Sequence, residues 1–250
     1  MLKEIFLKSS VIIPVRYGSS RFPGKPLAVI RGKTMIQRVY ERALESKEAD
    51  KIIVATDDER IYKEVENFGG EVRMTSASHV SGTDRIAEIA KSLKYDLIVN
   101  LQGDEPLIDP SLIDNSLSFM KANKRVKVCT FRKQISDHNA INDPSVVKVV
   151  SDRNGFALYF SRHPVPFPRG QKEEKIFYYK HIGIYTFDRE FLLKFSSLPP
   201  SPLERAEGLE QLRVLENGFR MKVLDTEYNP ISVDTPEDVK VVEDVIKETK

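Results

Sequence analysis

The sequence contains a single cysteine, almost no net charge and no long apolar run. Cys129 has no second cysteine to pair with, which excludes an internal disulfide, and its strand-like setting indicates a small buried side chain. Lys and Arg number 39 against 37 Asp and Glu, which excludes a nucleic-acid or membrane-surface binder that relies on bulk charge. No apolar segment reaches the ~18 residues that a membrane helix needs. These absences predict a cytoplasmic protein without membrane insertion, in which local charge performs the recognition.

Two common nucleotide-binding motifs are also missing. No G-x-G-x-x-G occurs, so the dinucleotide fingerprint is absent. A Walker A loop needs G-x4-G-K-[ST], but Gly18 and Gly24 enclose five residues, and Pro26 stands where the hydroxyl residue belongs. The segment Gly32-Lys33-Thr34 has the right ending, yet Leu27 occupies the required upstream glycine position. Any nucleotide that this chain binds must use a different phosphate-binding loop.

What the chain does contain is a short strand that leads into a basic loop. Val11 to Val15 is an apolar, mostly β-branched run typical of a buried parallel strand, and such strands carry functional loops at their carboxyl ends. The loop supplies the cations Arg16, Arg21 and Lys25, together with glycines at which the backbone can approach a ligand. This combination favours a triphosphate cradle. The alternative is a set of solvated loop cations.

Apolar residues switch between strand-like and helical periods through the first half of the chain. The pattern predicts strands at 51–55, 71–74 and 95–101 and helices at 34–46, 57–68 and 83–92, the first helix with Thr34 near its N-cap. Strands that alternate with helices imply a parallel sheet with right-handed crossovers. The fold class predicted is α/β with a mostly parallel sheet.

Beyond Asn123 the chain is richer in strands. We predict strands at 126–131, 146–150, 156–161, 176–187 and 221–224, which form a mixed or antiparallel section, and an extended proline-rich loop at 162–170. A helix is predicted at 203–217, and a last helix begins at Pro236, with Asp234 or Thr235 as its cap. At this length the chain is one large domain or a domain with a subdomain.

Two acidic residues stand where predicted strands end. Asp104, in Gln102-Gly103-Asp104-Glu105-Pro106, follows the 95–101 strand and would face the basic loop, so it is our first Mg²⁺ ligand. The alternative is a β-turn with its acids in solvent, and we assign Glu105 to that turn. Asp234 ends a strand predicted near 231–233; taken alone it indicates a helix cap, but beside Asp104 it indicates a second ligand.

Six motifs in order resemble one family. They are residues 13–26 (IPVRYGSSRFPGKP), 81–85 (SGTDR), 102–106 (QGDEP), 180–185 (KHIGIY), 209–213 (LEQLR) and 233–238 (VDTPED). Together they closely resemble the 3-deoxy-manno-octulosonate (KDO) cytidylyltransferases, also called CMP-KDO synthetases, over residues 10–245. The resemblance implies a Rossmann-like sheet of the nucleotide-diphospho-sugar transferase type and a homodimer. It also implies Mg²⁺-dependent transfer, in which the KDO hydroxyl attacks the α-phosphate of CTP to give CMP-KDO and pyrophosphate.

The resemblance also assigns roles to individual residues. Arg16, Lys25 and Asp104 would be catalytic, Asp104 and Asp234 would ligate Mg²⁺, and Arg21 is a weaker phosphate-binding candidate. The nucleotide would contact Pro14, Val15, Arg16, Lys25, Ser81, Gly82, Thr83, Arg85, Gln102 and Gly103. KDO would contact Gln102, Arg162, His181, Tyr185, Glu210 and Gln211, with Arg162 on its carboxylate because a guanidinium binds a carboxylate through two hydrogen bonds.

Simpler interpretations remain open for several of these residues. Ser81 or Thr83 fits a helix N-cap, His181 a polar residue at a strand edge, and Glu210 with Gln211 an exposed helix face. By the same resemblance, residues 10–125 would form the CTP-binding half, 126–225 a sugar-binding and dimerisation subdomain, and 226–250 a return to the active site.

Other functions are considered beside this one. The nearest alternatives are a cytidylyltransferase for sialic acid or 8-amino KDO and a metal-dependent glycosyltransferase of related fold, although the latter usually shows a D-x-D strand end that is missing here. A non-catalytic nucleotide-sugar sensor should lack one of the two metal acids, and both Asp104 and Asp234 are present.

Overall fold

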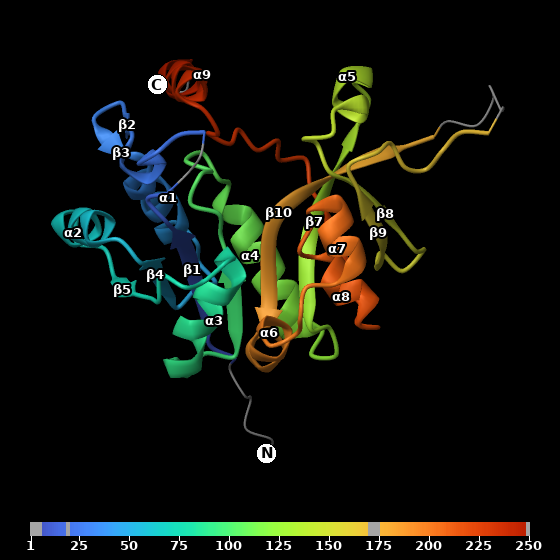
Figure 1. The fold of residues 1–250 in the computed structure, drawn as a ribbon, viewed down its shortest axis with the longest axis horizontal. Coiled ribbons are helices and arrows are strands. Elements are labelled where there is room, and N and C mark those ends of the chain that lie inside the picture. Colours follow the sequence, from blue (N-terminus) through green and yellow to red (C-terminus); the bar gives the residue numbers. More distant parts are fainter. Residues whose placement is uncertain (1–6, 19–20, 170–175, 249–250) are drawn as a thin grey trace.

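A computed structural model of the chain describes residues 7–18, 21–169 and 176–248 (Figure 1). Ser19 and Ser20 of the basic loop and Gly170 of the predicted proline-rich loop lie outside the described residues. Within the described residues, nine strands form one sheet, and its main path runs β11-β7-β10-β6-β1-β4-β5. Helices cover both faces of this sheet (Figure 1). The predicted α/β class is therefore confirmed.

The first half builds the parallel part of the sheet. Strand β1 (Ser9–Val15) lies between β4 (Lys51–Thr56) and β6 (Leu97–Asn100), parallel to both, and β5 (Val72–Met74) extends the sheet beyond β4. Because successive strand residues point to opposite faces, Val11 and Ile13 enter one core cluster and Ile12 enters the other. This two-sided burial explains why the β1 sequence is continuously apolar.

Three predicted helices are confirmed, the first with its predicted cap Thr34. These are α1 (Met35–Leu44), α2 (Glu59–Asn67) and α3 (Gly82–Ser92). Their N-cap side chains, from Thr34, Asp58 and Ser81, each accept a hydrogen bond from a backbone N–H of the first turn. The apolar faces of α1 and α2 pack on one side of the sheet and that of α3 on the other.

A further helix, α4 (Pro110–Ala122), was not predicted. Its signals are in the sequence: Asp109 accepts from the Ser111 N–H as N-cap, and Pro110 occupies the first helical turn. Leu112, Ile113 and Leu117 then recur at helical spacing and are buried under the sheet.

The second half adds antiparallel strands at the other edge. Strand β10 (Tyr178–Asp188) pairs antiparallel with β6, β7 (Val128–Ile135) and β8 (Lys148–Ser151), while β9 (Ala157–Ser161) pairs with β8. Cys129 is fully buried on β7, as predicted. The remaining elements here are α5 (His138–Asn142), α6 (Arg189–Ser196) and β11 (Lys222–Asp225), the last parallel to β7.

Two predictions for the C-terminal third are wrong. The helix expected at 203–217 is two short helices, α7 (Pro202–Glu207) and α8 (Leu212–Glu216), because Gly208 adopts a left-handed conformation (φ 62°) that ends α7. The strand expected at 231–233 is irregular backbone instead. The last helix, α9 (Pro236–Glu248), does begin at Pro236. The Asp238 carboxylate accepts from the backbone N–H groups of Asp234 and Thr235, so Asp238 secures the start of α9 and Asp234 faces elsewhere.

The basic loop leads into a short segment that α9 covers. A 3₁₀ turn (Lys25–Leu27, η1) is followed by a two-stranded ribbon of β2 (Val29–Ile30) and β3 (Lys33–Thr34). Val242 of α9 packs with Ile30 and Met35 in a small cluster of its own. This contact brings the end of the chain back to the basic loop (Figure 1).

Candidate active site

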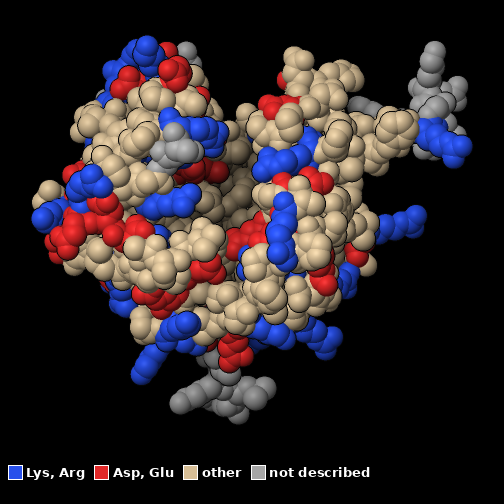
Figure 2. All heavy atoms as spheres, in the orientation of Figure 1, with Lys and Arg blue, Asp and Glu red and all other residues tan. Residues whose placement is uncertain are grey.

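A cleft of about 470 Å³ opens at the carboxyl ends of β1 and β6. The space-filling view shows a deep hollow between the two parts of the molecule, with basic and acidic side chains beside it (Figure 2). The switch point of an α/β sheet, where neighbouring strands lead off in different directions, is the usual place for a ligand. The cleft residues are Pro14, Val15, Arg16, Gly18, Arg21, Lys25, Pro26, His79, Val80, Ser81, Gly82, Arg85, Gln102, Gly103, Asp104 and Asp234.

This set includes almost every residue predicted to contact the nucleotide or metal. The exception is Thr83, which faces Glu210 instead. Three cleft residues, Pro26, His79 and Val80, had no predicted role in binding. The His79 ring is hydrogen-bonded to the Glu88 carboxylate of α3, which also accepts from the Ser76 N–H. Glu88 thereby attaches residues 76–79, which end in the cleft wall, to α3. The spacing of these residues in the sequence did not predict this contact.

The floor of the cleft requires glycine at position 103. A Cβ added to Gly103 would lie 2.2 Å from Val15 Cγ1 and 3.4 Å from the Pro14 carbonyl oxygen. The loop after β6 therefore rests directly on the end of β1, a distance that a larger residue does not allow.

We expect Gly103→Ala to lower the free energy of unfolding by about 1–3 kcal/mol, because the methyl group overlaps Val15. Binding of the nucleotide predicted for the cleft should weaken as well, since the two loops that line the cleft are pushed apart. Urea unfolding and a nucleotide titration measure the two effects. Gly183→Ala is the stability control: apart from its two chain neighbours, no described residue has an atom within 4 Å of its added Cβ, so a change below about 0.5 kcal/mol is expected there. Equal losses in both variants would contradict the packing argument.

Lys25 lies between the two predicted metal acids. Its ammonium is 2.8 Å from Asp104 Oδ2 and 3.5 Å from Asp234 Oδ1, and its side chain is only 15% exposed. The Arg21 guanidinium donates to the same Asp234 oxygen at 2.9 Å. A backbone hydrogen bond from Val233 N to the Asp104 carbonyl oxygen (2.9 Å) holds the two acidic segments together. Residues from three distant parts of the chain thus form one cluster of opposite charges.

The donor set of this cluster fits a magnesium ion. Carboxylate oxygens are hard ligands, and Mg²⁺ is typically held by one or two of them while phosphate oxygens and waters complete the octahedron. The convergence of Asp104 and Asp234 on one ammonium shows that a single cation can be shared between them. Among the described residues no group of three or more His, Cys, Asp or Glu side chains could hold a metal, so a closed protein cage is not available there.

Arg85 is buried and already paired. Its Nη2 donates to Asp57 Oδ2 at 2.8 Å, and its Nη1 is hydrogen-bonded to Thr75. These contacts connect α3 to the segments that follow β4 and β5. The guanidinium still borders the cleft, so it supplies positive charge to a wall that it also holds in place.

The two halves of the chain meet at Glu210. Its carboxylate accepts hydrogen bonds from Ser81 Oγ at 3.0 Å and Thr83 Oγ1 at 2.6 Å. Ser81 also caps α3, so its cap role, left open by the sequence, is present together with the cleft position. Burial raises the pKa of Glu210, against the two hydroxyl bonds and the nearby Arg213, which lower it. Glu210 is thus a largely enclosed carboxylate, and the exposed helix face considered as an alternative is wrong.

His181 and Tyr185 face the same side of β10. The His181 ring packs against Phe160 and Tyr185, with ring centroids 5.0 and 5.4 Å away. Its Nε2 is 2.9 Å from Thr130 Oγ1, and that hydroxyl has one proton, which it donates to a carbonyl of β10. His181 Nε2 is therefore the donor to Thr130. Burial lowers the pKa of His181 to about 3 and raises the pKa of Tyr185, to which the charge of Glu210 adds.

We expect His181 to make the protein sensitive to acid. The unfolded histidine binds a proton below its ordinary pKa of 6.5, whereas the folded one does so only near 3, so the free energy of unfolding falls as the pH drops between these values. The slope is at most about 1.4 kcal/mol per pH unit. His181→Gln should flatten the dependence measured by urea unfolding at pH 6, 5 and 4. The exposed His138→Gln is the control, and equal flattening in that variant would contradict the assignment.

Arg162 does not line the cleft. Its Nε donates to the Glu207 carbonyl oxygen at 2.7 Å, and its two Nη atoms donate to Pro144 and Gly208 carbonyls at 2.9 and 3.4 Å. These bonds attach the end of β9 to the turn after α7. The assignment of Arg162 to a sugar carboxylate stays a prediction, and the structure gives its guanidinium other partners.

Other predicted sugar contacts are near the cleft or in its wall. The Gln102 side-chain amide is 3.5 Å from Asn100 Oδ1 and lies on the cleft surface. Gln211 is buried at the start of α8, where it packs beside Glu210. Gln102 is therefore placed to touch a bound ligand, whereas Gln211 is enclosed by protein.

The prediction that Glu105 lies in a turn with its carboxylate in solvent is wrong. Its carboxyl group is buried, with 7% of the residue exposed, and Oε2 has no hydrogen-bond partner among the described residues. Burial, and next the charge of Asp104, raise the pKa of Glu105 to about 8, against the opposing charge of Lys180. The loop folds inward against the 226–234 segment, where Tyr228 donates to the Leu107 carbonyl oxygen, and this long-range contact could not be read from Gly, Asp and Pro alone.

The sheet and the cleft are those of an α/β nucleotidyltransferase, and proteins of similar sequence show to which family of these enzymes the chain belongs. The profile of the cytidylyltransferase family matches residues 10–225. The 3-deoxy-manno-octulosonate cytidylyltransferase of Solibacter usitatus is 52% identical over 236 residues, covering 94% of this chain and 93% of its own; that of Geobacter metallireducens is 51% identical over 247 residues, covering 95% and 97%.

Solved structures agree with these relatives. A CMP:2-keto-3-deoxy-manno-octonic acid synthetase complexed with CTP superposes with a TM-score of 0.92 at 43% identity, over 97% of this chain and all of that one. A cytidylyltransferase from Leptospira borgpetersenii, at 22% identity and a TM-score of 0.64, shares the fold over 97% of this chain and 87% of its own. This chain belongs to the 3-deoxy-manno-octulosonate cytidylyltransferase family.

Proposed function

We propose that the cleft transfers the cytidylyl group of CTP to KDO with the residues that surround Lys25. The product, CMP-KDO, is the activated sugar of lipopolysaccharide biosynthesis. The observation that carries the proposal is the cluster of Lys25, Asp104 and Asp234 on the cleft floor, opposite a wall of short polar residues that begins at Ser81. A base and ribose need a few fixed polar groups, and a triphosphate needs cations and a metal.

The reaction forms one bond and breaks one. The 2-hydroxyl oxygen of KDO bonds to the α-phosphorus of CTP, the bond from that phosphorus to the bridging oxygen breaks, and pyrophosphate leaves. The hydroxyl proton passes to a base, for which Asp104 is the candidate. Catalysis of this kind depends on positioning and charge neutralisation, so no covalent protein group is needed.

Individual residues take the roles that the family resemblance assigns to them. Arg16 and Lys25, with Arg21 at the edge, hold the phosphates. Asp104 and Asp234 hold Mg²⁺, which when bound neutralises charge on the triphosphate. The base and ribose contact Pro14, Val15, Ser81, Gly82, Thr83, Arg85, Gln102 and Gly103, and KDO contacts Gln102, Arg162, His181, Tyr185, Glu210 and Gln211. Thr83 and all of these KDO contacts except Gln102 lie outside the set of residues that line the cleft.

These assignments divide the chain into working parts. Residues 10–125 form the CTP half, 126–225 the sugar and dimerisation subdomain, and 226–250 the return that brings Asp234 to Asp104. Because CTP is a cytoplasmic nucleotide, we place the reaction in the cytoplasm. Within the residues that the structure describes, no helix is long and apolar enough to cross a membrane.

We also propose a homodimer formed through the second half. Strand β10 extends beyond the body of the sheet (Figure 1). The same half of the chain exposes large apolar side chains, among them Phe167 (84%), Leu158 (62%) and Phe177 (43%), the last directly before β10. Exposed apolar surface of this kind can serve as an interface between subunits. The oligomeric state can be measured by sedimentation, and a monomer at micromolar concentration contradicts this part of the proposal.

Pyrophosphate release tests the function directly. The protein is mixed with CTP and Mg²⁺ and offered KDO, 8-amino KDO or sialic acid in parallel. We expect release with KDO to exceed that with sialic acid. Release with KDO no greater than with sialic acid contradicts the proposal, and a preference for 8-amino KDO assigns the amino sugar as substrate. Omission of Mg²⁺ with a chelator present should abolish release.

A further inference from the structure

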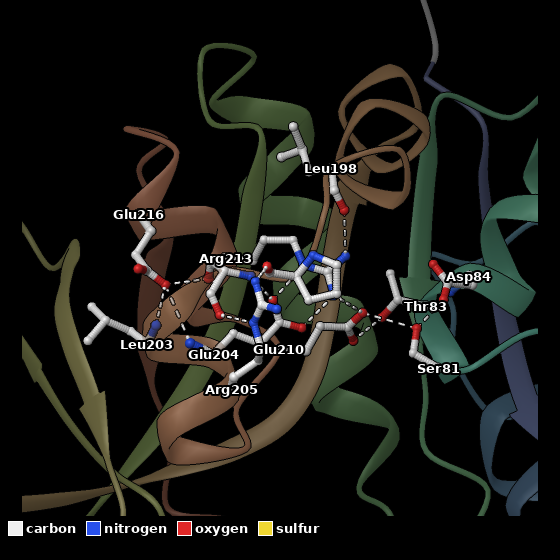
Figure 3. A network of polar contacts seen from close by, with 12 residues as sticks. Ser81, Thr83, Asp84, Leu198, Leu203, Glu204, Arg205, Glu210, Arg213 and Glu216 are labelled. Atoms are coloured by element: carbon white, nitrogen blue, oxygen red, sulfur yellow. Dashed lines mark hydrogen bonds and ion pairs between the residues drawn. The ribbon is translucent and has the colours of Figure 1, made fainter.

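A chain of polar contacts crosses from the sugar half to the nucleotide half through Glu210 (Figure 3). At one end, Ser81 and Thr83 donate to its two carboxylate oxygens from the start of α3. At the other end, Glu210 Oε1 lies 3.7 Å from Nη2 of Arg213 on α8. Glu210 therefore connects a wall of the cleft to a cation that lies outside it.

The Arg213 guanidinium is held on all sides. Its Nε and Nη2 donate to the two carboxylate oxygens of Glu204 at 2.7 and 2.5 Å, and its Nη1 donates to the Leu198 carbonyl oxygen at 3.2 Å. It also lies over the Phe195 ring, 5.0 Å from the centroid. The side chain is only 7% exposed. A fork fixed by two hydrogen bonds to one carboxylate has little freedom to rotate.

Glu204 explains how this rigidity is set. Ser201 N donates to the Glu204 carboxylate, which completes a capping box at the start of α7. Arg213 is thus attached to the beginning of α7 and reaches Glu210 just before α8. The Arg213 side chain therefore links the start of α7 to Glu210, and it does so across Gly208, where α7 ends.

Besides holding Glu210 in place, the positive charge of Arg213 influences the protonation of the Glu210 carboxylate. Burial disfavours the ionised carboxylate, and Asp84 on α3 acts in the same direction, whereas the guanidinium and the two hydroxyl bonds favour ionisation. An ionised carboxylate accepts from both Ser81 and Thr83, while a protonated one has lost part of that capacity. Arg213 therefore supports the form of Glu210 that accepts both hydrogen bonds from the start of α3.

We propose that Arg213 is a positioning residue for the transfer reaction, acting through Glu210. It holds the α7–α8 turn of the sugar half against the Ser81–Thr83 wall of the nucleotide half, and so fixes the separation between the sugar hydroxyl and the α-phosphate. The inference rests on the proposed function. Reacting atoms must be held ~3–3.5 Å apart, and a misplacement of about 1 Å can cost a factor of about 10² in rate. The effect therefore falls on kcat more than on the KM for CTP.

A double-mutant cycle tests this role. Arg213→Met is expected to lower kcat about 30-fold, with a change of less than about threefold in the KM for CTP. In a Glu210→Gln background the same substitution should lower kcat by less than about threefold, because the group through which it acts is already changed. Equal, multiplicative losses in both backgrounds overturn the proposal. Absence of activity in the unaltered protein instead refutes the proposed function.

Glu204→Gln separates positioning from stability. It weakens the bond between Arg213 and α7 but leaves the cation beside Glu210, so it should lower the melting temperature and reduce kcat by less than about threefold. If kcat falls by the same factor in Glu204→Gln and in Arg213→Met, Arg213 acts only by stabilising α7, and the inference fails. Should Arg213→Met not fold because the largely enclosed Glu204 carboxylate loses its guanidinium partner, the cycle is run with Arg213→Lys, which keeps the charge without the paired N–H donors and should restore part of kcat.

Discussion

Asp104→Asn is expected to lower kcat by about 10²- to 10³-fold while the protein stays folded. The substitution preserves size and removes one negative charge at the end of β6. The loop should keep its place, because it is attached to the 226–234 segment by the Asp104 carbonyl oxygen rather than by the carboxylate. What is lost is the proposed oxygen ligand for Mg²⁺ and a partner of Lys25 at 2.8 Å.

Three measurements separate these effects. Pyrophosphate release gives kcat, Mn²⁺ titration in the absence of nucleotide gives metal affinity, and circular dichroism reports the fold. Glu59→Gln is the control, since Glu59 is exposed at the start of α2 and pairs with Lys63 only at 3.9 Å. Near-normal turnover or unchanged Mn²⁺ affinity in Asp104→Asn would falsify the metal assignment. A similar loss in Glu59→Gln would point to net charge rather than to position.

Lys25→Met is expected to reduce kcat/KM for CTP by about 10²- to 10³-fold and to tighten Mn²⁺ binding in the absence of CTP. The effects on CTP and on Mn²⁺ have opposite signs because the ammonium has different partners with and without the nucleotide. With a triphosphate present, we expect the Lys25 ammonium to neutralise phosphate charge. Without one it lies between Asp104 and Asp234, where it competes with a metal ion for the same carboxylates.

Isothermal titration with Mn²⁺, and separately with CTP, distinguishes this exchange from general damage to the cleft. Lys33→Met is the matched control, because Lys33 lies nearby in β3 and pairs with Glu41 on the surface. That variant should change neither affinity by more than about twofold. If Lys25→Met weakens Mn²⁺ and CTP binding together, Lys25 maintains the shape of the floor and does not exchange partners.

Local patterns predicted the parallel half of the fold well. The β-branched runs of β1 and β4 and the capped helices α1 to α3 have short-range causes, namely two-sided burial and side-chain caps. In the second half, the prediction failed where a single residue interrupts a helical pattern. Gly208 divides a helical stretch in two, and only the backbone conformation it adopts reveals the break.

The site could be predicted only in part, for a related reason. Motif order located most of the cleft residues, because the motifs at 13–26 and 102–106 follow β1 and β6, whose carboxyl ends face one edge of the sheet. Partners were not predictable from motif order. Arg162 proved to bind backbone carbonyls, and Glu105 proved to be buried, because both outcomes depend on segments far away in the chain.

By itself the sequence determined the class of fold, the family and the identity of the charged residues, since periodicity, caps and motif order are local properties of the chain. Only the tertiary structure decided how those charges are shared. The loop that lacks a Walker A hydroxyl carries Lys25, and that lysine lies between two carboxylates that come from positions 104 and 234. Their meeting depends on one backbone hydrogen bond and on the packing of α9 against β2, which are long-range contacts. The same holds for Glu210 and Arg213, whose partners on α3 and α7 are chosen by packing rather than by spacing along the chain.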